Sequence, residues 1–74
     1  MSKTQGLAAR VPPHALTVDE FCHSHRISRA LFYLLQKENR GPRVMKCGRR
    51  TLIALESAEA WRRLMEAATV REAA

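Results

Sequence analysis

Two short helical segments joined by a very tight connection constrain this 74-residue chain more than any other feature. The second segment, Ile27–Lys37, opens with Ser28, whose hydroxyl can accept a hydrogen bond from a free N–H of the first helical turn. Apolar residues then recur at helical spacing, which predicts a buried face along Leu31, Phe32 and Leu35. We therefore expect a short amphipathic helix from Ser28 to Glu38.

A second helix is expected just before it, from Thr17 to His25. Thr17 and Glu20 have the spacing of a capping box, in which each side chain satisfies a backbone N–H of the other. Its apolar stripe consists of Val18, Phe21 and Cys22. Two short helices with so short a joint are typical of a helix-turn-helix, in which the second helix reads DNA.

The outer face of the expected Ser28–Glu38 helix favours contact with DNA. It carries cations, an aromatic residue and an amide, and no acid: Arg29, Ala30, Tyr33, Gln36 and Lys37. A helix face exposed only to water usually mixes both signs of charge. Phosphates can pair with the cations and base edges with the hydrogen-bonding groups.

A β-hairpin is expected after this helix. Asn39–Pro42 should end the helix, with Gly41 in the left-handed conformation that glycine favours. Strands Arg43–Cys47 and Arg50–Ile53 are joined by Gly48-Arg49, a two-residue hairpin signal. Alternation predicts a core-facing set that consists of Met45, Cys47, Thr51 and Ile53. A basic hairpin in this place is typical of a wing that contacts phosphates or a minor groove.

A third helix is expected over Glu56–Ala68, with an inward face made of Ala58, Trp61, Leu64 and Met65. Residues 69–74 either prolong it or form a tail. The expected fold is thus mainly α with a small β-hairpin, a winged helix-turn-helix. It spans residues 15–68 as one domain, after a flexible N-terminal arm of residues 1–14 and before a C-terminal tail of residues 69–74.

The charge of the chain is concentrated in one region. The net charge is +6, yet residues 26–50 hold eight cations and one anion, while the rest of the chain holds five cations and six anions. The whole excess therefore lies in the expected recognition helix and the hairpin that follows it. A polyanionic partner explains this distribution more simply than a solubilising charge, which would be spread more evenly.

Other function classes find less support. No apolar run approaches the ~20 residues of a membrane span, and residues 1–9 lack the apolar stretch of a signal peptide, so we expect a soluble cytoplasmic protein without a membrane partner. Cys22 and Cys47 are expected to be free thiols in the core. A zinc site that combines them with His14, His23 or His25 has no strong ligand spacing, so we expect no metal or other cofactor. The histidines lack placed acid and nucleophile partners, so we expect no enzymatic activity.

Five pieces of the chain, in order, resemble the AlpA-like helix-turn-helix regulators, which are related to phage excisionases and to MerR-type DNA-binding domains. The pieces are Leu16–Phe21, Ile27–Arg29 with Phe32-Tyr33, Gly41–Arg43, Gly48–Ile53 and Ser57–Trp61. The resemblance covers residues 15–65. It implies a winged helix-turn-helix protein of a prophage or other mobile element in the bacterial nucleoid, acting as an excisionase, a transcriptional regulator or both.

The resemblance also assigns roles by position. Arg29, Tyr33 and Lys37 match the recognition helix, and Arg49 and Arg50 match the wing. Leu34 departs from the polar residue often found at its position, and it can contact a thymine methyl, pack on a second copy or join the core. Ala54 departs from the usual capping residue, so the third helix is expected to start late, near Leu55 or Glu56.

We therefore expect binding to double-stranded DNA, self-association on repeated sites, and an integrase or recombinase as a further partner. The expected DNA-contacting residues are Arg26, Ser28, Arg29, Ala30, Tyr33, Lys37, Arg43, Lys46, Arg49 and Arg50. The alternative is a protein-interaction module of the same fold that docks an acidic partner through an exposed Leu34 and Val44.

Overall fold

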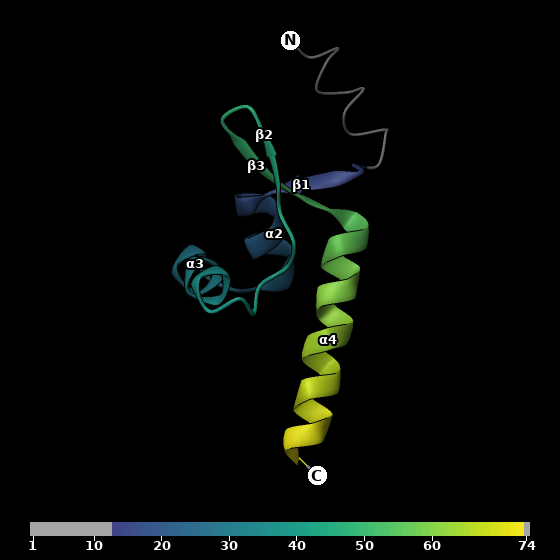
Figure 1. Cartoon of the computed structure of the whole chain (residues 1–74). Coiled ribbons are helices and arrows are strands. Elements are labelled where there is room, and N and C mark those ends of the chain that lie inside the picture. Colours follow the sequence, from purple (N-terminus) through teal and green to yellow (C-terminus); the bar gives the residue numbers. More distant parts are fainter. Residues whose placement is uncertain (1–12, 74) are drawn as a thin grey trace.

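The computed structural model describes residues 13–73, so most of the predicted arm of residues 1–14 lies outside the described part of the chain. The elements, in chain order, are β1 (Ala15–Thr17), α2 (Val18–His25), α3 (Arg29–Lys37), β2 (Met45–Cys47), β3 (Arg50–Ala54) and α4 (Leu55–Ala73) (Figure 1). They form a small mixed α/β unit with one antiparallel sheet. The layout, three helices and a three-stranded sheet in the described residues, is compatible with a winged helix.

Both predicted caps of the helix pair are confirmed. The N–H of Glu20 donates to Thr17 Oγ1 over 3.1 Å, and the N–H of Thr17 donates to Glu20 Oε1 over 2.9 Å. The N–H of Leu31 donates to Ser28 Oγ over 3.0 Å. Between the helices Arg26 takes the left-handed conformation, with a φ of 58°, and closes the short connection. These bonds satisfy N–H groups of the first turns that no helical carbonyl can reach.

The sheet contains a strand that the sequence analysis missed. Its order is β1-β3-β2, and β1 pairs antiparallel with β3 so that Leu16 lies opposite Ile53. The sequence analysis had assigned no strand to residues 15–17 and had begun the Thr17–His25 helix there. A three-residue strand is too short to display alternation, and its hydrogen bonds come from a strand more than thirty residues away in the chain.

The predicted faces of the hairpin were wrong for the first strand. Gly48-Arg49 does form a two-residue loop, with a Gly48 φ of 63°, and this loop sets Cys47 opposite Arg50. Directly paired residues point to the same face of a sheet, and successive residues to opposite faces. Met45 and Cys47 therefore lie on the side of Arg50 and are exposed, whereas Ile53 is buried on the other side.

The core is centred on Phe21. Its ring stacks on His25 at a centroid distance of 4.0 Å and makes edge contacts with Phe32 at 5.6 Å and Trp61 at 5.4 Å. Trp61 also donates its indole N–H to the carbonyl of Arg40 over 2.8 Å. Trp61 thus covers one side of the core, as expected. The buried apolar cluster is Val18, Phe21, Cys22, Phe32, Ile53 and Ala58.

Two leucines expected in the core are exposed instead. Phe32 is buried and Leu35 half-buried, but Leu31 is 40% exposed because α3 packs mainly on α2 and presents a narrow stripe to it. On α4, Ala58 is buried and Leu64 is 66% exposed. Helical periodicity gave the correct direction for both faces and overestimated their width.

The left-handed residue after α3 is Asn39, with a φ of 60°, and not Gly41 as predicted. Glycine at position 41 instead leaves room for a neighbouring side chain. A Cβ there would lie 2.6 Å from Nε2 of Gln36, whose amide donates to the carbonyl of Pro42 over 2.8 Å. This bond ties the end of α3 to the segment that leads into β2.

Helix α4 begins at Leu55, within the predicted late start. Its first N–H donates to the carbonyl of His14 over 3.0 Å, so backbone beside β1 replaces the capping side chain that Ala54 lacks. The carbonyl of His14, at the end of the predicted arm, thus contacts the start of α4. The helix continues through residues 69–73, so these residues prolong the helix and do not form a separate tail. Among the described residues, no helix combines the length and apolarity required for crossing a membrane.

Candidate nucleic-acid interface

The exposed face of α3 carries half of the predicted contacts. Ser28, Arg29, Ala30, Tyr33 and Lys37 are all exposed. The ring of Tyr33 lies edge-on to Phe32 at 5.2 Å, which fixes the tyrosine against the core while leaving 51% of the residue exposed. Leu34 is 49% exposed, which excludes a core role and leaves contact with a thymine methyl or a second copy. Helix α3 therefore presents a rigid outer face of mixed cationic and hydrogen-bonding character.

The hairpin adds a second group of cations. Lys46, Arg49 and Arg50 are exposed, in the middle of β2, in the loop and at the start of β3. Lys46 Nζ donates to Thr51 Oγ1 over 2.7 Å, so its ammonium group is held against the strand. Backbone pairing between β2 and β3 fixes where these charges lie relative to the sheet.

One open groove brings α3 and the hairpin together. Arg29 and Tyr33 line it from α3, and Arg49 and Arg50 line it from the hairpin, with Thr17 and Leu52 between them. In Figure 1, α3 and the hairpin tip lie on the same side of the molecule, away from α4. A neighbouring hollow is lined by Tyr33, Val44 and Lys46. Tyr33 therefore lies where the two surfaces meet.

The remaining predicted residues lie elsewhere. Arg26 is exposed in the turn between α2 and α3, and Lys37 lies in the last turn of α3. Arg43 lines a groove against Trp61 of α4, separate from the groove that Arg29 lines. Gln36, which the sequence placed on the same outer face, is half-buried and already bonded to Pro42. The groove thus unites four of the ten predicted contacts, and the neighbouring hollow adds Lys46.

Sequence reasoning missed one charged residue beside the groove. Asp19 of α2 forms an ion pair with Arg29 of α3, with 2.9 Å between Oδ1 and Nη1. A hydrogen bond to Tyr33, followed by the charge of Asp19, raises the pKa of the Arg29 guanidinium further. Asp19 and Arg29 are ten residues apart and belong to different helices, so no spacing rule within one helix predicts that they pair.

The other cations of this side have no such partner. Within residues 13–73, no ion pair involves Lys37, Lys46, Arg49 or Arg50. The exposed side of α4 differs, because acids and bases alternate along it and Arg63 pairs with Glu59 at 3.3 Å. The unbalanced positive charge is therefore a property of the α3 and hairpin side, as the charge distribution along the sequence indicated.

The structure does not assemble a metal site from the residues that were weighed for one. Cys22 is buried beside Phe21, whereas Cys47 is exposed on the hairpin, and both are free thiols. His25 Nδ1 lies 2.8 Å from the carbonyl of Phe21. Across residues 13–73, no three histidine, cysteine or acidic side chains gather as metal ligands would.

Comparison with known proteins adds nothing to this geometry. No family model, curated protein or solved structure matches the chain. A function therefore has to come from the shape and charge of the chain's own surface.

Proposed function

We propose that this chain is a sequence-specific DNA-binding protein without enzymatic activity, in which α3 enters a major groove and the hairpin contacts the flanking backbone or minor groove. The observation that carries the proposal is the groove in which Arg29 and Tyr33 of α3 lie beside Arg49 and Arg50 of the hairpin. This proposal includes the finer assignment of the fold as a winged helix-turn-helix.

The chemistry of this side suits a duplex. Cations that carry no carboxylate partner can pair with phosphates, which fixes register and orientation on DNA without reading sequence. The exposed hydrogen-bonding groups of α3 can meet base edges, which differ between base pairs in the major groove. An α-helix fits the width of that groove.

A single module of this size buries only ~600–1,000 Å² of protein surface on DNA, so useful specificity calls for several copies on repeated or palindromic sites. With the resemblance to AlpA-like regulators, this supports a role as an excisionase, a transcriptional regulator of a mobile element, or both. An adjacent integrase gene, DNA bending, and excision with purified integrase would support the first role. Failure to bend any bound site would count against it.

Binding of a labelled random-sequence duplex, followed by fluorescence anisotropy over a salt series, tests the proposal. Counterion release makes log affinity fall linearly with log salt, by ~0.9 per phosphate neutralised. Arg50→Ala should weaken binding to all sequences and lower this slope by about one. Arg71→Ala, which removes an exposed arginine from the last turn of α4, is the matched control and should leave the slope unchanged. No binding at low salt would overturn the proposal.

The second candidate is a protein-interaction module for an acidic partner. Its support is the exposure of Leu34 on α3 and Val44 before β2, two apolar residues near the basic groove. It predicts that Arg29→Ala and Arg50→Ala leave DNA binding absent or unchanged. A lower slope of log affinity against log salt in Arg50→Ala would favour the DNA-binding proposal over this one.

A further inference from the structure

We propose that Arg29 is the specificity-determining residue of the interface, that it reads a guanine in the major groove, and that Asp19 positions it to do so. This inference rests on the proposed DNA-binding function and adds to it the base that is read and the residue that orients the reader. Arg29 is in the first turn of α3, the end of a recognition helix that contacts base edges.

The position of Arg29 is defined by an ion pair. Asp19 Oδ1 accepts from Nη1 over 2.9 Å, and Tyr33 lies one helical turn further along α3, in the same groove. A guanidinium has five N–H donors in a planar fork, so the contact with Asp19 leaves donors free. Two of them can bond O6 and N7 of guanine, which is the commonest specific contact in protein–DNA complexes.

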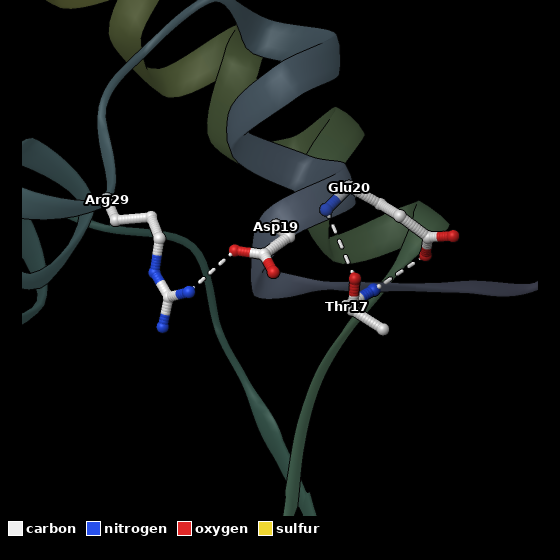
Figure 2. A network of polar contacts seen from close by, with 4 residues as sticks. All are labelled: Thr17, Asp19, Glu20 and Arg29. Carbon is white, nitrogen blue, oxygen red and sulfur yellow. Dashed lines mark hydrogen bonds and ion pairs between the residues drawn. The ribbon is translucent and has the colours of Figure 1, made fainter.

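The helical turn that carries Asp19 is itself held in place. Thr17, the last residue of β1, and Glu20 close the capping box around the first turn of α2, and Asp19 lies inside that turn (Figure 2). Thr17 is also paired with Leu52 in the sheet. Hydrogen bonds therefore join the sheet to the turn that carries Asp19, and the carboxylate of Asp19 pairs with the guanidinium of Arg29 (Figure 2).

Stability does not explain this ion pair. The side chains are 61% exposed for Arg29 and 71% exposed for Asp19, and exposed pairs contribute little to folding. An acid beside a phosphate-binding groove also weakens the attraction to DNA. Both costs are understandable if the pair selects one orientation of the arginine, because a preorganised side chain loses less entropy when it binds.

Variants that separate charge from geometry test the inference. After selection of a preferred site from random duplexes, Arg29→Lys keeps the charge but lacks the fork. It should lose roughly 5- to 150-fold discrimination at one guanine while the salt slope stays the same. Asp19→Ala should lose part of this discrimination, yet bind random duplex at least as well as the wild type, because a negative charge is gone.

Replacement of single guanines by 7-deazaguanine identifies the contact, because it removes the N7 acceptor. One position should lower wild-type affinity and have no effect on Arg29→Lys. Glu56→Ala is the matched control, since it removes an exposed acid from the first turn of α4. It should leave discrimination intact. Asp19→Asn, which keeps an accepting oxygen, covers the case in which Asp19→Ala folds poorly.

The outcomes separate the two proposals. Absence of binding to any duplex by the wild type would overturn DNA binding itself. Binding with no preferred sequence, or with a preference that Arg29→Lys leaves intact, would overturn only the role of Arg29. If the sequence preference is lost in Arg29→Lys but unchanged in both Asp19 variants, Asp19 does not position Arg29. Its role is then only that of an acid that stabilises the positive N-terminal end of α2.

Discussion

The burial of a single side chain determines how much its truncation destabilises this small domain. Ile53 of β3 is fully buried in the apolar cluster, whereas Leu64 is 66% exposed although both are large aliphatic side chains. Ile53→Val should lower the free energy of unfolding by ~0.5–1.5 kcal/mol, the cost of one buried methylene and its cavity. Leu64→Ala should stay within ~0.5 kcal/mol of the wild type. Urea denaturation of both variants measures this, and a larger cost for Leu64→Ala would show that its side chain is covered in solution.

The buried thiol makes stability depend on pH. Desolvation by burial raises the pKa of Cys22 above its ordinary value of 9.0; Arg29 opposes the rise and Asp19 adds to it. The folded state therefore holds this proton to higher pH than the unfolded state. The stability that the protonated Cys22 thiol contributes to the folded state is fully present below pH 9, and it is lost as the pH rises past that value through the pKa of the folded state. The free energy of unfolding should therefore fall as the pH rises above 9.

Cysteine variants identify the source of that fall. Cys22→Ala should reduce the steepness of the fall, since the residue with the raised pKa is gone. Cys47→Ala should leave it unchanged, because that thiol is exposed in the folded protein. Equal slopes in the wild type and Cys22→Ala, compared at matched denaturant, would contradict the assignment.

Contacts of individual residues could be predicted from the sequence where the two partners are only a few positions apart in the chain. The Thr17–Glu20 capping box and the Ser28 cap depend on groups three residues apart, and both formed as predicted. Burial was less predictable, because Leu31 fits the helical period and yet no element lies over it among the described residues. The Asp19–Arg29 pair was missed for the same reason: it exists only once two helices are packed.

At the scale of elements, the junction after α3 depends on one close approach. A methyl group on Gly41 would meet the Gln36 amide at 2.6 Å and displace it from Pro42. Gly41→Ala should therefore cost ~0.5–1.5 kcal/mol, the net value of one hydrogen bond. The same change in a Gln36→Ala background should cost less, since no amide remains to be displaced. Thermal or urea unfolding of the four-variant cycle gives this coupling, and strict additivity would contradict it.

Element boundaries were predictable to the extent that they are marked by turn chemistry. Gly48-Arg49 gave the hairpin loop, and the absence of a cap at Ala54 gave the late start of α4. Strand β1 was not predictable, because three residues become a strand only through pairing with β3. The predicted face of the first hairpin strand was wrong because alternation was counted separately on each strand, whereas the two-residue loop couples the strands and sets Cys47 opposite Arg50.

At the scale of the whole molecule, charge and shape divide the surface into two sides. The α3 and hairpin side carries cations without carboxylate partners among residues 13–73, apart from Arg29 with Asp19 and, just after α3, Arg40 with Glu38. Helix α4 runs along the other side of the domain and alternates acids with bases (Figure 1). The position of the charged groove was foreseeable in part, since the excess charge lies in residues 26–50. The separation of Arg43 from that groove was not, since it depends on how the segment before β2 crosses to α4.

This division predicts a one-sided response to DNA. In a ¹H–¹⁵N NMR titration with a short duplex, the largest amide shifts should fall in α3 and in residues 46–51, where helix N–H groups and the hairpin meet phosphates and bases. Amides of residues 62–72 should shift little, although Arg62, Arg63 and Arg71 are also exposed cations. The shifts should diminish at high salt as phosphate contacts weaken. A response distributed evenly over every exposed arginine would instead mean attraction by net charge alone, and a response centred on α4 would mean that the DNA-binding surface lies on the opposite side of the domain.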